Sequence, residues 1–358
     1  MGKGLRALAA ALLAATGLAA CSDGAGGERT PKIGVILPDS ATSNRWEQAD
    51  RKFLKEAFDA AGVQSDIQNA QGDKSQFQTI ADQMITNGAT VLMIVNLDSG
   101  TGRAVLRNAR AKGVATIDYD RLTLDGGAQY YVSFDNVGVG RLMGQGLIRC
   151  LTDMGTTRPV VATLNGSETD NNSTLFKAGY DGELQKKYDT REYVKGPDQW
   201  VPDWVNAQAG TMFEQMMTET GGKIDGVLAA NDGLANAVIQ VLRRQGLNGK
   251  VPVTGQDADV EGLQNILSGD QCMTVYKDIK QEASAAADLA IALARGETRP
   301  APATVRDTVS GREVPSVLLQ PRAIYRDNVD DVVTAGYVTA EELCTGNFAK
   351  LCADNGVG

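Results

Sequence analysis

The sequence predicts an α/β protein with two lobes, each a doubly wound parallel sheet. Short β-branched apolar runs alternate with longer amphipathic segments, which is the pattern of strands buried on both faces and helices that cover them. The chain has 358 residues, more than the ~250–300 at which one core usually divides. Both halves also show the same strand-and-helix order, as two like-folded domains would.

The elements follow this alternation along the chain. The first strand, helix, strand and helix are expected at 32–37, 47–61, 64–68 and 76–87. Five further apolar runs, each followed by a helical pattern, are expected as strands at 91–95, 115–119, 160–164, 226–230 and 251–254. A strand at 130–134 and a helix at 137–151 place the domain boundary between Asp135 and Asn136. Segment 314–324 is expected as one further strand.

One glycine pattern lies inside the predicted helix 137–151. Gly138, Gly140 and Gly144 are spaced as GxGxxxG. A dinucleotide-binding loop requires GxGxxG between a strand and a helix, with an acidic residue further on. We therefore interpret these glycines as sites of close helix packing.

Composition and charge exclude several classes of function. The chain has 35 Lys and Arg residues against 44 Asp and Glu, a net charge of -9. Such a chain repels phosphate backbones, so no nucleic-acid partner is expected. It contains no His, which removes Ser-His-Asp triads, Cys-His dyads and His-ligated zinc. With no P-loop motif either, we expect no cofactor, no metal and no catalytic residue, and binding is favoured over catalysis.

The first thirty residues have the layout of an export signal. Lys3 and Arg6 precede an apolar run, residues 8–20, that is too short to span a membrane as a mature helix. The run ends in Leu-Ala-Ala-Cys21, which resembles a bacterial lipobox. This resemblance implies removal of a signal peptide, residues 1–20, and a diacylglycerol on Cys21, with residues 21–31 as a flexible tether. The alternative is an ordinary signal peptide with Cys21 as a plain thiol.

Four more cysteines follow, an even number that makes two disulfides plausible in an oxidising compartment. Cys344 and Cys352 bracket a short loop, so local pairing is favoured, which leaves Cys150 with Cys272. The alternative is four reduced, buried thiols, because spacing does not establish disulfide geometry.

Polar side chains follow nearly every predicted strand, where ligands of open parallel sheets bind. Carboxylates, Arg, Lys, Asn and Trp together suit a ligand with many hydroxyls and apolar C–H faces, such as a sugar. The alternative for any one of the Asp or Asn residues is a helix N-cap. The residues that follow the predicted strands include Arg45, Trp46, Asp120, Arg121, Asp170, Asn172, Asn231, Asp257 and Lys277, and Trp200 is one of only three Trp residues.

Eight segments between about Lys32 and Leu343 carry a family resemblance. They are Arg45-Trp46, Ile117-Asp-Tyr-Asp-Arg121, Tyr131-Val-Ser-Phe-Asp-Asn136, Gly166-Ser-Glu-Thr-Asp-Asn-Asn172, Asp198-Gln-Trp200, Ala230-Asn-Asp232, Thr254-Gly-Gln-Asp-Ala-Asp259 and Met273-Thr-Val-Tyr-Lys277. With them the chain resembles the substrate-binding lipoproteins of bacterial ABC sugar importers, in the type I periplasmic-binding-protein superfamily. Within that superfamily it is most similar to the D-xylose-binding group.

The resemblance implies two α/β lobes joined by a three-strand hinge, with crossings near Asp135, Lys277 and 301–304. The N-terminal lobe would comprise 32–135 and 278–303, the C-terminal lobe 136–277 and 304–343, and residues 344–358 a tail. A monosaccharide, with D-xylose favoured, would lie between the lobes, and Trp46 and Trp200 would form its aromatic walls. The candidate ligand-binding residues that form hydrogen bonds would be Arg45, Asp120, Arg121, Asn172, Asn231, Asp257 and Lys277, with Asp170 as their neighbour. The resemblance further implies a monomer, lipid-anchored to the outer face of the cytoplasmic membrane, that delivers the sugar to an ABC permease.

Three alternatives accompany this hypothesis. The first is another monosaccharide, such as arabinose, ribose or glucose. The second is a sugar-sensing subunit that contacts a membrane receptor. The third is a glycoside-processing enzyme with Asp257 and Asp259 as paired carboxylates; it is disfavoured because a site enclosed between two lobes would exclude polysaccharides.

Overall fold

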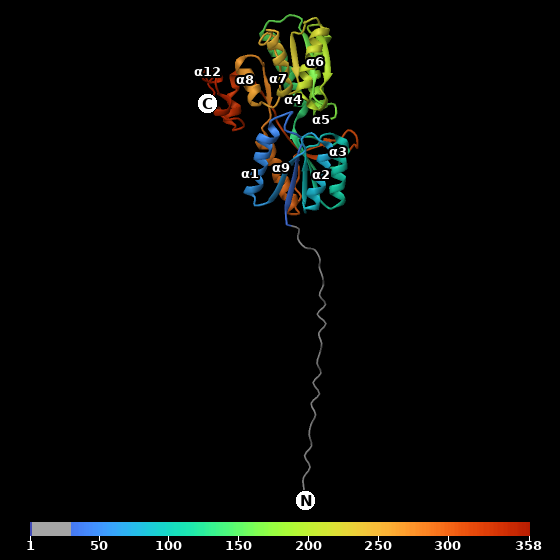
Figure 1. Cartoon of the computed structure of the whole chain (residues 1–358). Coiled ribbons are helices and arrows are strands. Elements are labelled where there is room, and N and C mark those ends of the chain that lie inside the picture. The colour runs from blue at the N-terminus through green and yellow to red at the C-terminus, as the bar shows by residue number, and fades with distance from the viewer. Residues whose placement is uncertain (2–29) are drawn as a thin grey trace. The chain divides into compact units, whose positions relative to one another are not determined.

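The computed structural model describes residue 1 and residues 30–358, and residues 31–358 form one compact unit. The lipobox cysteine, Cys21, and nearly all of the predicted signal peptide and tether lie outside the described residues. Among the helices that are described, none is long and apolar enough to cross a membrane. The unit consists of two α/β lobes (Figure 1), as the sequence predicts.

Within the described residues, the N-terminal lobe has a seven-stranded sheet of order β10-β11-β5-β4-β3-β1-β2. Neighbouring strands pair in parallel, except β10 with β11. The strands are β1 (Lys32–Leu37), β2 (Gln64–Asn69), β3 (Val91–Ile94), β4 (Ala115–Tyr119), β5 (Tyr130–Phe134), β10 (Ala303–Arg306) and β11 (Glu313–Leu319). The helices are the π-helical turn η1 (Trp46–Asp50), α1 (Arg51–Ala60), α2 (Lys74–Thr86), α3 (Ser99–Ala111) and α9 (Ile279–Ala294).

Helices cover both faces of this sheet. Ile33, Val35 and Leu37 of β1 enter the core that includes side chains of α1 and α9. Ile36 enters the opposite core, which includes side chains of α2 and α3. In Figure 1, α1 and α9 accordingly lie together, as do α2 and α3. The uninterrupted apolar run of β1 is therefore explained by alternate side chains that fill two separate cores.

The C-terminal lobe is built on the parallel sheet β7-β6-β8, which isolated bridges at Val253 and Thr254 extend. The sequence predicts a strand, 251–254, where these bridges lie. The strands are β6 (Val160–Asn165), β7 (Val194–Trp200), β8 (Gly226–Ala229), and the antiparallel pair β9 (Thr274–Tyr276) and β12 (Arg322–Ile324). The helices are α4 (Asn136–Asp153), α5 (Asn171–Asp189), η2 (Pro202–Trp204), α6 (Asn206–Glu219), α7 (Asp232–Arg244), α8 (Val260–Ser268), η3 (Arg326–Asn328), α10 (Asp330–Thr334), α11 (Ala340–Leu343) and α12 (Phe348–Asp354).

The described chain crosses between the lobes three times, and one crossing differs from the prediction. The first two follow β5 at Asp135 and β9 at Lys277. The third joins β11 to β12, not 301–304, because β11 pairs with β5 of the N-terminal lobe while β12 pairs with β9. Residues 304–319 therefore do not belong to the C-terminal lobe, and the predicted single strand 314–324 is two strands. Pro321 separates them, since it has no N–H to continue a ladder.

The C-terminal tail is part of the C-terminal lobe. Leu343 and Cys352 share an apolar core with Leu263 and Ile266 of α8, and Figure 1 shows α12 beside α8. A disulfide joins Cys344 to Cys352, and a second joins Cys150 to Cys272. This is the pairing that the cysteine spacing favours.

Glycines allow α4 and α5 to pack closely. A Cβ atom added to Gly140 would collide with the backbone of Phe176, and one added to Gly179 would collide with the carbonyl of Val137. Gly144 also lies against the backbone of α5, at Tyr180. The GxGxxxG spacing therefore serves helix packing, as we interpreted it.

Gly140→Ala should lower the free energy of unfolding by about 1–3 kcal/mol, since the new methyl group meets backbone that must shift. Gly182→Ala is the control, because Gly182 also lies inside a helix, the partner helix α5, but faces open space. It should instead raise stability by roughly 0.5–1 kcal/mol. Urea unfolding followed by circular dichroism measures both, and equal effects of the two substitutions would contradict this packing.

Candidate functional site

One cavity between the lobes collects residues from the carboxyl ends of strands in both sheets. β1, β4, β6, β8 and β9 each end next to it, as expected for parallel sheets. Its empty volume is about 340 Å³, including the part open to solvent. The residues that line it are Thr42, Ser43, Arg45, Trp46, Asp120, Arg121, Asp170, Asn172, Phe176, Trp204, Asn231, Gln256, Asp257 and Lys277. Every candidate from the sequence is among them except Trp200.

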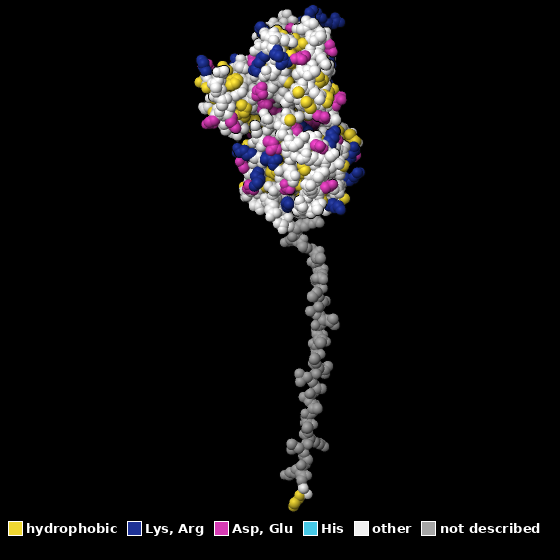
Figure 2. All heavy atoms as spheres, viewed as in Figure 1, with side chains coloured by type: hydrophobic (Ala, Val, Ile, Leu, Met, Phe, Trp, Pro, Cys, Tyr) yellow, Lys and Arg dark blue, Asp and Glu magenta, His cyan; other side chains and the backbone are white. Residues whose placement is uncertain are grey.

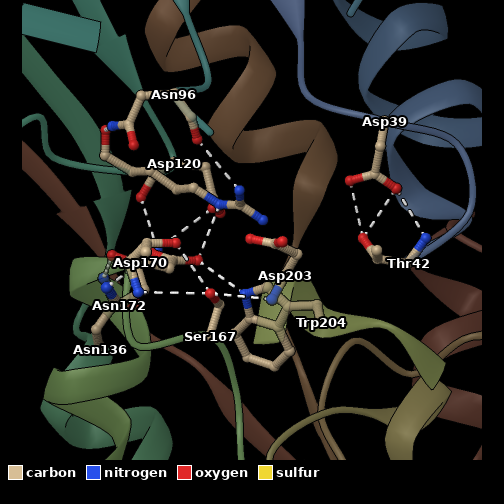
Figure 3. Close-up of polar contacts among 12 residues, drawn as sticks. Asp39, Thr42, Asn96, Asp120, Asn136, Ser167, Asp170, Asn172, Asp203 and Trp204 are labelled. Carbon is tan, nitrogen blue, oxygen red and sulfur yellow. Dashed lines mark hydrogen bonds and ion pairs between the residues drawn. The ribbon is translucent and has the colours of Figure 1, made fainter. Parts of the chain in front are cut away.

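Trp204, and not the predicted Trp200, lines this cavity from the C-terminal lobe. Trp200 is the last residue of β7, and its ring lies 6.0 Å from the Lys177 ammonium. Beyond it, Asp203 and Trp204 adopt left-handed φ angles of 49° and 59°. This turn buries the Trp204 indole, whose Nε1 donates to Asp170 Oδ2 at 3.1 Å (Figure 3). The carboxyl-end rule itself favours Trp204, because Trp204 lies beyond the strand whereas Trp200 lies within it.

Three side chains hold Asp120 in a conformation that non-glycine residues rarely adopt. Its φ is 62°, in the left-handed region. Its carbonyl oxygen accepts hydrogen bonds from Ser133 Oγ at 2.7 Å, Asn172 Nδ2 at 2.9 Å and the Tyr131 hydroxyl at 3.2 Å. Asn172 comes from α5 of the other lobe (Figure 3). Strained backbone of this kind persists where its surroundings over-determine it, typically at functional sites.

The carboxylate of Asp120 lies among cations. Its Oδ2 accepts from Arg45 Nη1 at 2.8 Å and lies 3.8 Å from Lys277 Nζ. Burial alone would raise the pKa of Asp120, but Arg45, Lys277 and Arg121 hold that pKa below its ordinary value. Asp120 is therefore an ionised acceptor that faces the cavity.

Further ion pairs and hydrogen bonds cross between the lobes at the cavity. Ser43 Oγ of the N-terminal lobe donates to Asp257 Oδ2 of the C-terminal lobe at 3.1 Å. At the second crossing, Lys277 Nζ lies 3.1 Å from the other oxygen of Asp257. Arg121 Nε lies 3.0 Å from Asp170 Oδ2, but its N–H is not directed at that oxygen, so this contact is an ion pair and not a hydrogen bond. The cavity is thus lined by charged groups from both lobes.

The N-cap alternative holds for two candidates without removing them from the cavity. Asp170 Oδ1 accepts from the Asn172 amide at 2.9 Å and caps α5, while its other oxygen faces Arg121 and Trp204. Asn231 caps α7 by accepting from the Leu234 amide at 2.9 Å. Each residue therefore both begins a helix and presents a polar group to the cavity.

Sequence reasoning missed five lining residues. Phe176 lies one helical turn beyond Asn172 on α5, and Gln256 directly precedes Asp257. Their proximity to these predicted site residues could have indicated that both line the cavity. Thr42 and Ser43 lie in the same loop as Arg45. The fifth missed residue is Trp204.

Several buried polar atoms of the cavity have no hydrogen-bond partner among the described residues. They are Trp46 Nε1, Arg121 Nε and Gln256 Oε1. Buried polar groups are nearly always hydrogen-bonded. Two donors and an acceptor without partners therefore fit a ligand that can both accept and donate hydrogen bonds.

Neither metal nor paired-carboxylate chemistry is supported here. In residues 30–358, no group of three or more acidic or cysteine side chains could hold a metal ion. Asp259, the partner of Asp257 in the enzyme alternative, does not line the cavity. It caps α8 by accepting from the Gly262 amide at 2.6 Å, and burial raises its pKa to about 6.

The fold and this cavity define a two-lobed solute-binding protein. Residues 33–298 match the model of the periplasmic binding protein domain, and the chain belongs to this family. Because this is a family of substrate-binding proteins, the chain is not an enzyme.

Named relatives and solved structures agree with this family. The chain is 34% identical, over 87% of its length and 92% of the relative's, to the D-xylose-binding periplasmic protein of Escherichia coli (strain K12). It is 30% identical, over 87% of its length and 92% of the relative's, to the multiple sugar-binding periplasmic receptor ChvE of Rhizobium radiobacter. It is also similar to an ABC transporter solute binding protein from Clostridium phytofermentans with bound β-D-glucose, with a TM-score of 0.80, 27% identity and coverage of 87% and 99%.

Trp204→Ala should weaken ligand binding by roughly 1–3 kcal/mol, because an apolar wall is lost. D-Xylose, the ligand in the name of the E. coli relative, is a suitable probe for calorimetry. Trp200→Ala is the matched control and should change the affinity by less than about 0.5 kcal/mol. A larger loss from Trp200→Ala than from Trp204→Ala would contradict the position of this wall.

Proposed function

We propose that the protein binds a monosaccharide between its lobes and delivers it to the permease of an ABC importer, with D-xylose as the favoured sugar. The observation that carries the proposal is the set of lining side chains. Two indoles, Trp46 and Trp204, can cover the apolar C–H faces of a sugar ring. Carboxylates, cations and amides around them can accept from and donate to its hydroxyls.

Charge pairing supports a neutral ligand. Arg45, Arg121 and Lys277 already contact Asp120, Asp170 and Asp257 respectively. An anionic ligand would displace a carboxylate from its cation, and burying an unpaired charge is costly. A neutral sugar can instead add charge-assisted hydrogen bonds to these pairs without breaking them.

D-Glucose is the second candidate ligand. Two of the similar solved structures contain glucose, and two named relatives bind D-xylose. The sugar-sensing alternative also stays, because one relative is named a multiple sugar-binding receptor. A calorimetric panel of aldopentoses and aldohexoses on the chain from Ser22 onward separates the candidate sugars.

We further propose that the protein acts as a monomer outside the cytoplasmic membrane, anchored there by a lipid on Cys21. The support is the lipobox together with relatives that are named periplasmic. Cys21→Ala should release the chain from membranes and leave sugar affinity unchanged, because Cys21 precedes the folded unit. Equal membrane retention of Cys21→Ala and the wild type, measured by sedimentation, would contradict the anchor.

Asp257→Ala and Arg121→Ala test the site between the lobes. Each should cost roughly 2–5 kcal/mol of sugar binding, or about thirtyfold to several thousandfold in dissociation constant. Small-angle scattering should show compaction by xylose in the wild type and much less in either variant, because the ligand drives closure by binding the closed state better.

Two exposed residues provide controls. Arg103 and Asp59 each form a surface ion pair, with Asp125 and Lys55 respectively. Arg103→Ala and Asp59→Ala remove the same side-chain types and should leave binding unchanged. Normal binding and closure by both site variants would refute the site.

A further inference from the structure

The guanidinium of Arg45 is almost completely occupied by carboxylates. Nε and Nη2 donate to the two oxygens of Asp50 at 2.9 and 2.8 Å. Nη2 also donates to Glu282 Oε2 at 2.7 Å, and Nη1 donates to Asp120 at 2.8 Å. A guanidinium has five N–H groups. Among the described residues, one N–H of Arg45, on Nη1, is therefore left for a ligand in the cavity.

The local helix geometry explains the pairing with Asp50. Arg45 directly precedes η1, the π-helical turn in which each hydrogen bond spans five residues. Asp50 is five residues beyond Arg45, so its carboxylate lies against the guanidinium edge-on. The hydroxyl of Tyr119 donates to Asp50 Oδ1 at 2.6 Å and holds that carboxylate in place.

Glu282 is different, because Arg45 is its only side-chain partner among the described residues. It lies on α9, is completely buried, and does not line the cavity. Its Oε1 has no partner in the described part of the chain. Burial raises the pKa of Glu282 well above its ordinary value, although Arg45 opposes this shift. Burying a carboxylate that makes one bond and leaves its other oxygen unpaired costs free energy, so Glu282 itself adds little to the net stability of the fold.

We propose that Glu282 is a positioning residue for the ligand site: by binding the outer edge of Arg45 it fixes the direction of the one N–H that Arg45 offers to the sugar. This proposal rests on the proposed function. Glu282 follows the second crossing by only five residues. The helix that leaves the hinge therefore sets the orientation of a donor in the cavity.

Glu282→Leu and Glu282→Gln in the full chain, purified in detergent, test the proposal with D-xylose and its monodeoxy analogues. Gln keeps an acceptor for Nη2, so its affinity should stay within about threefold of the wild type. Leu removes the acceptor and should weaken D-xylose binding by about tenfold. The lost affinity should come from one hydroxyl of the sugar. The wild type should bind the analogue that lacks this hydroxyl more weakly than D-xylose, whereas Glu282→Leu should bind the two with nearly equal affinity. For each of the other monodeoxy analogues, the loss of affinity relative to D-xylose should be the same in Glu282→Leu as in the wild type.

Stability and an exposed acid on the same helix provide the controls. Urea unfolding should show that Glu282→Leu still unfolds cooperatively, at a lower urea midpoint because buried Arg45 loses one acceptor, so that its sugar affinity can be measured on folded protein. Asp288→Leu removes an exposed acid from α9 and should leave binding and the deoxy-sugar profile unchanged. A uniform loss across all analogues, an unchanged affinity in Glu282→Leu, or failure of Gln to restore binding would overturn the proposal.

A measurement without sugar separates this proposal from the proposed function. The Arg45 guanidinium lies 4.3 Å above the Trp46 ring, so the near-ultraviolet circular dichroism band that Trp46→Phe removes reports the position of Arg45. That band should change in Glu282→Leu and not in Glu282→Gln. If no sugar binds the wild type, the proposed function fails, while an altered band still supports the positioning of Arg45. An unaltered band in Glu282→Leu overturns the positioning role whether or not sugar binds.

Discussion

The site depends on the way Asp120 is held where the two lobes meet. Its left-handed backbone turns the carbonyl toward Ser133 and Tyr131 of its own lobe and Asn172 of the other. The same residue presents its carboxylate to Arg45. One of the hydrogen bonds that fix Asp120 therefore comes from the other lobe, through Asn172. The contact between the lobes and the position of the Asp120 carboxylate beside Arg45 thus depend on one another.

Burial of so many charges requires them to pair. Three cations and five carboxylates lie at the cavity or directly behind it: Arg45, Arg121, Lys277, Asp50, Asp120, Asp170, Asp257 and Glu282. Burial raises the pKa of Glu282, whereas nearby cations keep the pKa of Asp120 low. The cluster therefore contains an ionised acceptor at the cavity, Asp120, and a more easily protonated acid behind it, Glu282. On the face shown in Figure 2, by contrast, basic and acidic side chains are interspersed on the surface, where water solvates them.

Features of the fold and the site that depend on a local pattern of residues could be predicted from the sequence. The apolar run of β1 and the polar residues after strand ends are local features, and both predictions followed from them. The position of Trp204 in the cavity was not predicted, because Asp203 and Trp204 adopt left-handed φ angles that their residue types do not indicate. The assignment of 304–319 failed because strand pairing is non-local: nothing within β11 specifies that its neighbour is β5. The contact of Glu282 with Arg45 could not be predicted either, since the residue pattern of a helix does not show which distant side chain a buried acid contacts.

The central claim is that a monosaccharide binds between Trp46 and Trp204, held by charged groups from both lobes. A crystal structure of the protein, determined from crystals grown with D-xylose, tests this claim most directly. We expect the sugar ring between these two indoles, with hydroxyls in contact with Arg121 from one lobe and Asp257 from the other. A sugar that lies elsewhere on the protein, or a ring covered by Trp200 and not by Trp204, would contradict the account.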